Sequence, residues 1–300
     1  MSEVLSWLSA IEFRNPSLHA RLRASVSLVT SALHVYGGKN ELVLSFNGGK
    51  DSTGVLHLLR AALVLRAAAA AGADVEKNEG GNAAAPMPLA PAASEAGYGD
   101  GVLLGGVRVV YFAGSAERDF QEVTDFMSQC ERRWRFRVER LGDFRVGLTE
   151  LVTAGARGVL MGTRGGDPDA RSLCGPFAPT TSGGGWPPVM RVNPLLNVSY
   201  VQLWAFLRGA KLDTCCLYEK GYTSLGDIDS SVPNPALKVG VIKTLLTDVV
   251  SSCVSVCSWH GLLASATVCY CAANADVLYL PAWELLDGDL ERAGREKGRK

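Results

Sequence analysis

A glycine-rich loop at residues 45–52 carries the side chains best suited to chemistry, in the order Ser-Phe-Asn-Gly-Gly-Lys-Asp-Ser. Gly48 and Gly49 can adopt positive φ and bring backbone N–H groups close to an anion. Lys50 adds a full positive charge, and a helix expected to begin near Asp51 directs its positive end to the same place. The loop therefore predicts a site for the phosphates of a nucleoside triphosphate, rather than a plain strand-to-helix turn.

This loop differs from the Walker A loop at two positions. A Walker A loop has a glycine five residues before its Gly-Lys pair, and a Ser or Thr directly after the lysine. Here Leu44 holds the first position and Asp51 follows Lys50. An acidic side chain in an anion-binding loop repels phosphate unless a divalent cation lies nearby. Asp51 therefore predicts Mg²⁺ held between its carboxylate and the triphosphate.

The loop is expected to join a strand to a helix. Residues 42–46 form a short apolar run, which suits a buried parallel strand. Apolar residues in 55–65 recur on one helical face. Residues 4–35 predict two helices that are broken near Asn15 and Pro16.

Strands and helices are expected to alternate downstream of the loop. Further strands are predicted at 107–112, 135–138 and 158–162, and further helices at 117–131, 144–155 and from Tyr200 through Leu207. This alternation predicts an α/β fold with a doubly wound, mainly parallel sheet flanked by helices. Ligands of such sheets bind outside the carboxyl ends of the strands. The polar motifs of this sequence follow those ends.

The composition is that of a globular chain with a sizeable core. Of the 300 residues 47% are apolar and 20% are charged, and the formal net charge is zero. Because nucleic-acid binders usually show a basic face, we expect no nucleic-acid partner. The eight cysteines lack paired spacing, which predicts reduced thiols rather than a disulfide framework or a zinc site.

The N-terminal residues show no charged segment followed by an apolar run, so no secretory signal is expected. Arg14, Arg21 and Arg23 leave an organellar transit peptide open. The expected location is the cytoplasm. The sequence gives no indication of the oligomeric state.

Two segments depart from the composition of the rest. Residues 72–100 are rich in Ala and Gly and predict a disordered insertion. Residues 239–278 form an atypical Cys-, Val- and Ser-rich insertion, in which 249–275 contain no charged side chain. Length alone permits a membrane span there, but the many Ser, Thr and Cys residues make the segment only mildly apolar, which argues against a span. An additional buried element and translated non-coding sequence are the other interpretations of 239–278.

A second polar motif follows the fourth expected strand. Residues 161–169 contain Arg164 and Asp167 on either side of the flexible pair Gly165-Gly166. An arginine suits a phosphate in bidentate geometry, and an aspartate suits a metal or a ligand N–H or hydroxyl group. Taken alone, a surface loop with an Arg–Asp pair explains these residues equally well.

Longer strings accompany the two motifs, and they carry a resemblance. They are Gly-Thr-Arg-x-x-Asp-Pro at 162–168, Trp-Pro-x-x-Met-Arg-x-Asn-Pro-Leu-Leu at 186–196, a Tyr-x-x-x-Trp-x-x-Leu helix from Tyr200, Gly-Tyr-Thr-Ser-Leu-Gly at 221–226, Asn-Pro-Ala-Leu at 234–237, and a closing segment at 281–295. The loop at 45–52 resembles that of the ATP pyrophosphatase superfamily, where it grips the departing pyrophosphate. Taken in order, the strings resemble those of the eukaryotic FAD synthases (FMN adenylyltransferases), with a PAPS reductase-like fold.

The resemblance implies that AMP passes from ATP to FMN, giving FAD and pyrophosphate, and it implies a role for each matching residue. The implied catalytic residues are Asn47, Lys50, Asp51, Arg164, Asp167, Arg292 and Arg295, with Asp51 also meeting Mg²⁺. Those implied to contact ATP are Ser45, Phe46, Gly48, Gly49, Ser52, Phe112 and Gly162. Those implied to contact FMN are Asp167, Trp186, Arg191 and Tyr222. Without the resemblance, Arg292 and Arg295 would be a solvated basic tail, and Phe112 an ordinary core aromatic.

The expected organisation has four parts. Residues 1–37 form N-terminal helices, 38–238 a catalytic domain for ATP and FMN, 239–278 the atypical insertion, and 279–300 a tail whose arginines complete the site. Two other functions remain open. One is a sulfur-metabolism relative of the PAPS reductase type, although no Glu-Cys-Gly-x-His string is found. The other is a nucleotide- or flavin-binding protein without turnover.

Overall fold

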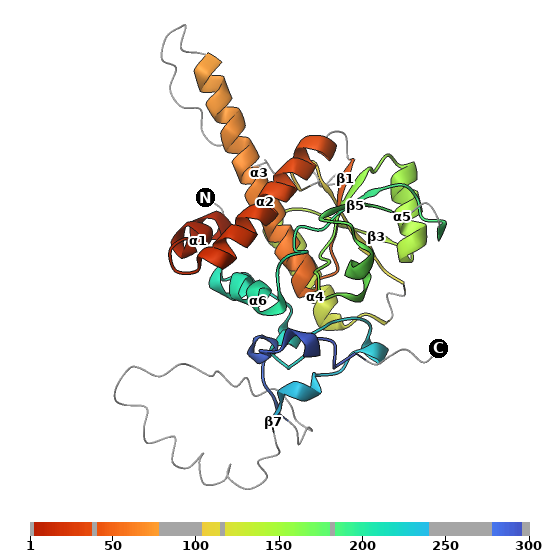
Figure 1. Ribbon diagram of the computed structural model, residues 1–300. Helices are drawn as coiled ribbons and strands as arrows, with labels where there is room; N and C mark the ends of the chain where they lie inside the picture. The colour runs from red at the N-terminus through yellow and green to blue at the C-terminus, as the bar shows by residue number, and fades with distance from the viewer. Residues whose placement is uncertain are drawn as a thin grey trace. The chain divides into compact units, whose positions relative to one another are not determined.

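The computed structural model describes residues 3–37, 41–77, 104–114, 118–180, 184–239 and 278–295 (Figure 1). The chain divides into two compact units between Cys215 and Cys216. This point lies within the range 38–238 that the sequence predicts as one domain, and the four predicted ranges stay predictions. Each unit is described by itself below.

The first unit is built on a six-stranded sheet. Its strands are β1 Leu42–Ser45, β2 Arg108–Phe112, β3 Val138–Leu141, β4 Gly158–Leu160, β5 Phe177–Pro179 and β6 Met190–Val192. They lie in the order β3-β2-β1-β4-β6-β5. All neighbours are parallel except β5, which pairs antiparallel with β6 at the edge. The predicted mainly parallel sheet is confirmed.

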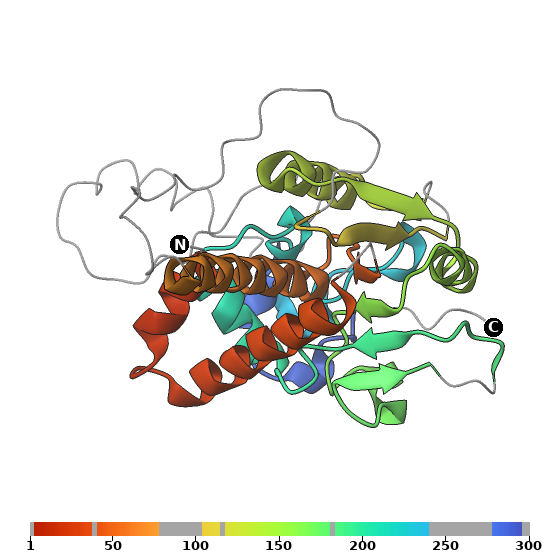
Figure 2. The ribbon, with the colours of Figure 1, turned by 90° about the horizontal axis from the view of Figure 1, so that it is seen from above.

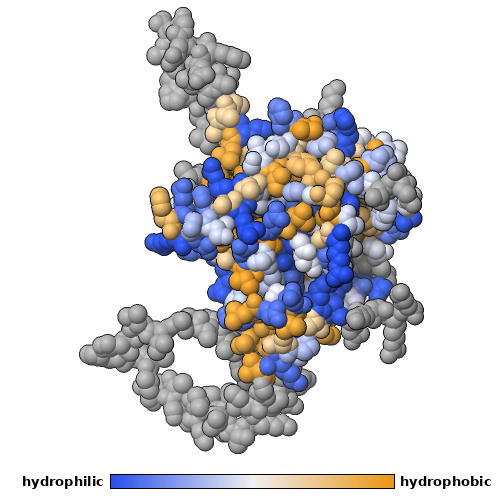
Figure 3. Space-filling view, viewed as in Figure 1, coloured by the Kyte–Doolittle hydropathy of each residue, from blue (hydrophilic) through white to orange (hydrophobic). Residues whose placement is uncertain are grey.

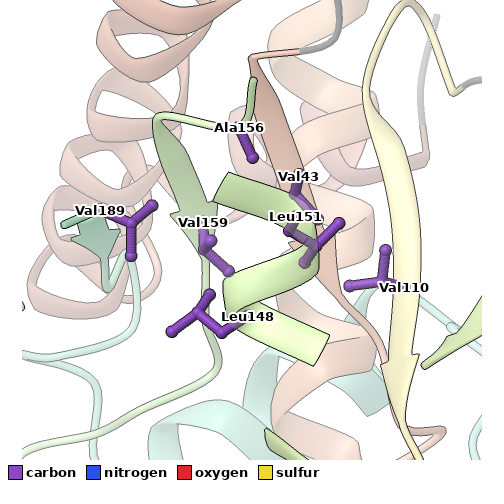
Figure 4. Packing of buried hydrophobic residues seen from close by; sticks show 7 residues of the cluster. All are labelled: Val43, Val110, Leu148, Leu151, Ala156, Val159 and Val189. Carbon is purple, nitrogen blue, oxygen red and sulfur yellow. The ribbon is translucent and has the colours of Figure 1, made fainter. Parts of the chain in front are cut away.

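Helices cover both faces of this sheet (Figure 2). They are α1 Glu3–Ile11, α2 Pro16–Tyr36, α3 Lys50–Lys77, α4 Gln121–Trp134, α5 Phe144–Thr153 and α6 Tyr200–Gly209. Helices α2 and α3 pack together on one face, and His57 of α3 contacts Trp134 at the end of α4. Helix α5 covers the opposite face (Figure 4). The sheet is therefore doubly wound, as predicted.

The core on the α5 side is formed by apolar side chains of the strands in the middle of the sheet. Val43, Val110 and Val159 point from three neighbouring strands toward Leu148 and Leu151 of α5 (Figure 4). Continuous apolar strands of this kind suit a parallel sheet that is buried on both faces. On β1 the three residues 42–44 are fully buried, so this strand is a fixed support for the loop that follows it.

The strand order places a topological switch point between β1 and β4. The chain leaves β1 through α3 on one face, whereas α5, which precedes β4, lies on the other face. The loops that follow β1 and β4 both lie at the carboxyl edge of the sheet there, where ligands of such sheets bind. Both polar motifs found in the sequence lie on these two loops.

Several predicted boundaries in this unit are wrong, among them the helix predicted at 117–131, which is Gln121–Trp134. The third strand is Val138–Leu141, not 135–138, because Arg135 ends α4 in the left-handed conformation (φ 54°) and delays the strand. Helix α3 continues to Lys77, into the range 72–100 predicted to be disordered. Its alanines have high helix propensity, which explains this continuation. Residues 78–100 lie outside the described residues.

Helix α3 is also the one described helix that is long and apolar enough to cross a membrane by length and composition, over Lys50–Ala70. Half of that window is buried inside the protein, and a core helix passes the same test. The outer part of α3 shows apolar surface in Figure 3, and Val64 and Leu65 are exposed there. The segment 249–275, considered above as a span, lies outside the described residues.

The second unit consists of short turns and one small sheet. Strand β7 Lys238–Val239 pairs antiparallel with β8 Leu278–Tyr279. The residues on either side of the predicted insertion are therefore neighbours in this unit. The 3₁₀ turns are Cys216–Tyr218, Ile228–Ser230, Pro235–Leu237, Ala282–Glu284 and Gly288–Leu290.

His57 provides a test of the packing between α3 and α4. Burial, followed by the charges of Arg60 and Arg133, lowers the pKa of His57 from 6.5 to about 3. The folded state therefore keeps His57 neutral while the unfolded chain takes up a proton below pH 6.5. The free energy of unfolding should fall with decreasing pH between 6.5 and about 3, by ~1.4 kcal/mol per pH unit from this group.

We expect His57→Gln to remove this contribution, because glutamine does not titrate and its amide oxygen can accept from Arg60 as His57 Nδ1 does. Urea unfolding of both proteins at several pH values between 5 and 8 measures the difference in slope. Parallel curves for the two proteins would contradict the assigned pKa.

Candidate functional site

The glycine-rich loop is held in shape by its own side chains. Asn47 Oδ1 accepts hydrogen bonds from the Gly49 N–H at 3.0 Å and from Ser52 Oγ at 2.7 Å. Ser52 Oγ in turn accepts from the Asn47 N–H at 3.3 Å. Two of the amides predicted to bind phosphate are thus used inside the loop. Helix α3 begins at Lys50, and the first N–H groups of a helix lack intrahelical partners, so they are suited to an anion.

Gly48 is required by both its backbone and its surroundings. Its φ is +70°, and a Cβ would lie 3.0 Å from Met127 and 3.2 Å from Val123 of α4. Only glycine meets both conditions without strain. The expected positive φ is confirmed for Gly48, whereas Gly49 does not have one.

The charged centre of the site is a trio of side chains. Asp51 Oδ2 accepts from Lys50 Nζ at 2.9 Å, and Asp51 Oδ1 accepts from Arg164 Nε at 2.5 Å. The side chains of Lys50 and Arg164 are only 2% and 4% exposed. Burial alone would raise the pKa of Asp51, but the charges of Lys50 and Arg164 lower it below its ordinary value. The trio carries one negative and two positive charges, so its net charge favours an anion.

This arrangement does not fit the predicted magnesium role of Asp51. Both of its carboxylate oxygens already accept hydrogen bonds from cationic side chains, and a divalent cation would need to displace one of them. The described residues also contain no cluster of three or more His, Cys, Asp or Glu side chains that could hold a metal ion. We therefore assign Asp51 the role of an ion-pair bridge, and no step below depends on a metal held by the protein.

The loop after β4 meets the loop after β1 at Gly162. A Cβ at this position would lie 2.9 Å from the carbonyl carbon and the Cβ of Asp51, and 3.0 Å from Ser52 N. Further on, Asp167 Oδ2 accepts from the Arg164 N–H at 2.8 Å, and the Gly165 N–H donates to Leu196 O at 2.8 Å. Asp167 thus fixes the turn that presents Arg164. The structure thus brings Gly162 and Arg164 against Asp51 of the phosphate loop, and Asp167 against the backbone of Arg164.

A cavity of about 410 Å³ lies on the α5 side of the same loop. It is lined by Phe144, Met161, Thr163, Ser172, Leu173, Thr180, Trp186 and Arg191. Its volume is in the range of small-ligand pockets, and its lining joins apolar side chains with a few polar groups. Arg191 Nε is buried there without a hydrogen-bond partner among the described residues. Trp186 and Arg191, both predicted to contact FMN, therefore share one cavity.

Two residues predicted to contact ATP have side chains that pack on other aromatic residues. Phe46 is fully buried, packs edge-on against Phe136, and donates its N–H to Val110 O at 2.8 Å. Its side chain does not reach the surface of the loop. Phe112 packs against Phe144 with ring centroids 4.6 Å apart, as the core interpretation expects. An adenine contact for Phe112, and an ATP contact for Ser45 at the end of β1, stay predictions.

Three of the predicted residues lie in the second unit, where the motif strings interlock. Asn234 Nδ2 donates to Thr223 Oγ1 and to Leu290 O, both at 2.8 Å. The Val232 N–H donates to Gly294 O at 2.9 Å. These bonds join the strings at 221–226 and 234–237 to the tail that carries Arg292 and Arg295. Tyr222 belongs to the first of these strings.

Arg295 is not a solvated side chain, contrary to the interpretation without a resemblance. Its guanidinium lies so close to Gly226 that a Cβ there would overlap it, and its Nε is buried without a hydrogen-bond partner among the described residues. Burial and the charge of Arg292 lower the pKa of Arg295, while Asp227 raises it. Arg292 is exposed. Whether these arginines act with the phosphate loop stays a prediction.

Sequence reasoning missed Tyr200 and most of the residues that line the cavity, among them Phe144. Tyr200 lies beneath Lys50 and Arg164, and Phe144 lines the cavity. Both belong to expected helices, where an aromatic residue is ordinarily a core residue. The sequence did contain a signal for Tyr200, because this residue begins the helix that follows the string at 186–196.

Gly162→Ala tests the contact between the two loops. The added Cβ would push against the first turn of α3, so we expect the affinity for a non-hydrolysable ATP analogue to fall at least about tenfold. Isothermal titration calorimetry measures this change. Gly166→Ala is the matched control, because a Cβ there meets no atom within 4 Å. Equal affinities for the two variants would contradict the tight contact.

Comparison with known proteins gives relatives for both the sequence and the fold. The phosphoadenosine phosphosulfate reductase domain family matches residues 146–233. A probable FAD synthase of Caenorhabditis elegans is 31% identical over 222 residues, which are 73% of this chain and 35% of the relative. The flavin adenine dinucleotide synthase of Saccharomyces cerevisiae is 31% identical over 150 residues, which are 46% of this chain and 47% of the relative. The chain thus spans about a third to a half of the length of these relatives.

Among solved structures, the FMN adenylyltransferase of Candida glabrata superposes with a TM-score of 0.64 at 21% identity, covering 99% of this chain and 94% of that protein. Yeast FAD synthetase gives a TM-score of 0.61 at 21% identity and covers 98% of this chain and 99% of that protein. At this identity the likeness establishes the fold. Because similar sequences and the same fold converge on one group, the chain is a relative of the eukaryotic FAD synthases.

Proposed function

We propose that this protein is an FMN adenylyltransferase, which transfers AMP from ATP to FMN and releases FAD and pyrophosphate. A phosphate oxygen of FMN attacks the α-phosphorus of ATP and forms the new P–O bond. The bond from the α-phosphorus to the bridging oxygen breaks, and the electron pair leaves with pyrophosphate. The FMN phosphate is already ionised at neutral pH, so the reaction needs no general base.

One observation carries this proposal. The charged trio of the phosphate loop lies at the switch point of the sheet, and the loop that supplies Arg164 to the trio also lines the cavity of Trp186 and Arg191. Thr163, which lines the cavity, immediately precedes Arg164 of the trio. A triphosphate at the loop and a flavin in the cavity would bring the two substrates to the same strand end. The names of the sequence relatives, FAD synthases of several eukaryotes, support this pair of substrates.

The described residues account for catalysis by positioning and charge. Lys50 and Arg164 neutralise the phosphates as negative charge moves to the leaving pyrophosphate. The Asn47 turn and the Asp51 bridge fix these groups before the nucleotide arrives, so little reorganisation is needed during the reaction. Asp167 holds the turn that presents Arg164. In this scheme Arg191 supplies its guanidinium to a polar atom of the flavin.

Two parts of the proposal rest on the resemblance and not on geometry. They are the action of Arg292 and Arg295 at the phosphates and the contact of Tyr222 with FMN, whereas the proposed cytoplasmic location rests on the N-terminal residues and the cysteine spacing. Magnesium reaches the assays together with ATP, and the proposal assigns it no protein ligand. We propose no nucleic-acid partner and no membrane association.

The reaction is tested with purified full-length protein, FMN and ATP in the presence of magnesium chloride. We expect FAD and pyrophosphate to form in equal amounts, measured by chromatography and by a coupled pyrophosphate assay. Tight FMN or ATP binding without either product would favour a binding protein without turnover. Sulfite formed from PAPS and a thiol reductant would favour the sulfur-metabolism alternative.

Variants of the two loops test the roles assigned above. We expect Asn47→Ala and Asp167→Ala each to slow FAD formation at least about tenfold, because each loses the acceptor that shapes its loop. Circular dichroism should show an intact fold in both variants. Asp167→Asn keeps an acceptor for the Arg164 N–H but removes the negative charge. A rate restored to that of the unmodified protein would show that Asp167 acts by positioning Arg164. A rate as slow as that of Asp167→Ala would show that the charge of the carboxylate is needed. Rates equal to the unmodified protein in both alanine variants would refute the assigned roles.

A further inference from the structure

Tyr200 is a buried residue that contacts both cations of the site. It is the first residue of α6 and is 2% exposed. Lys50 Nζ lies 5.5 Å from the centroid of its ring, and Arg164 Cζ lies 5.9 Å from it. The face of an aromatic ring is electron-rich and attracts cations within about 6 Å, most strongly where water is excluded. Here one ring serves two buried cations.

The charges explain why such a contact matters at this place. Asp51 brings one negative charge to the two positive charges of Lys50 and Arg164. Helices α3 and α6 both begin at this site, at Lys50 and Tyr200, and the N-terminus of a helix carries partial positive charge. Positive charge therefore accumulates and tends to push the two cations apart. A negative ring face beneath both of them offsets this repulsion without neutralising the site.

The ring is held firmly enough to position its neighbours. Ser199 and Gln202 form a capping box at the start of α6, which fixes the backbone at Tyr200. Helix α6 also packs closely on α3, since a Cβ at Gly54 would lie 3.0 Å from Leu203. The helix that bears Lys50 and the helix that bears the ring thus form one rigid pair.

We propose that Tyr200 is a positioning residue: its ring face holds Lys50 and Arg164 in the arrangement that receives the phosphates of the nucleotide. Asp51 fixes the two cations through ion pairs, and the ring fixes them through cation–π contacts. The proposal rests on the proposed function in one respect, since it takes a nucleotide to be the anion that these cations bind.

A series of fluorinated phenylalanines at position 200 tests the ring directly. Fluorine withdraws electron density from the ring face while it changes the shape of the side chain little. Tyr200→Phe is the reference, because it removes the hydroxyl group from the comparison. With one, two and three fluorines added, we expect the affinity for a non-hydrolysable ATP analogue to fall stepwise. The total loss should be at least about fivefold between Phe and trifluoro-Phe.

The controls separate this effect from a general loss of structure. Phe206→Leu removes an aromatic ring from the same helix, one that packs on Trp7 instead of on the cations. It should lower thermal stability and leave the affinity for the ATP analogue unchanged. The KM for FMN should stay constant along the fluorinated series. Equal ATP-analogue affinities across that series would overturn the proposal.

The outcome for Tyr200 is distinguishable from the outcome for the proposed function. Failure of the unmodified protein to bind the ATP analogue would refute the nucleotide site itself, and with it the role of Tyr200. Binding of the analogue without FAD formation refutes only the transferase, and the fluorinated series still decides the role of the ring. FAD formation together with a flat series refutes only the inference about Tyr200.

Discussion

The bridge from Asp51 to Lys50 and Arg164 is the interaction on which the site depends. It joins the first turn of α3 to the loop after β4, across 113 positions in the sequence. These two loops follow β1 and β4, the strands on either side of the switch point of the sheet. Without the bridge, two almost fully buried cations would face each other without this shared counter-ion. Breaking a buried ion pair by removing one partner typically costs about 3–5 kcal/mol, because the remaining charge stays desolvated. The bridge therefore stabilises the site and fixes the arrangement of its two loops.

A buried ion pair rarely adds much to stability compared with apolar packing, so its presence needs another reason. The reason here is preorganisation. The trio keeps an excess of positive charge in a place from which water is largely excluded, where an anion gains more from it than at the surface. Gly48 and Gly162 allow the backbone of the two loops to approach closely enough for this. The absence of side chains at these two glycines thus allows the buried charges to come together.

The sequence predicted the parts of this arrangement that depend on local residue types. The phosphate loop followed from its two glycines, its lysine and its place between an apolar strand and a helix. The pairing of Asp51 with Arg164 did not follow, because a separation of 113 residues is decided by strand order and not by spacing. For that reason Asp51 was assigned to magnesium. Phe46 was assigned to ATP because it lies within the motif, but it directly follows a strand that is buried on both faces, and its side chain is buried in the core. The third strand was misplaced because the left-handed end of α4 at Arg135 leaves no periodic signal.

The second unit shows how the motif strings remain joined despite the long segment between them. Strands β7 and β8 bring the two ends of residues 240–277 together, so the chain closes a loop at this point. Asn234 alone makes two buried or part-buried hydrogen bonds to the other strings, and each contributes roughly 1 kcal/mol. These hydrogen bonds hold the strings at 221–226 and 234–237 to the tail that carries Arg295, within the second unit.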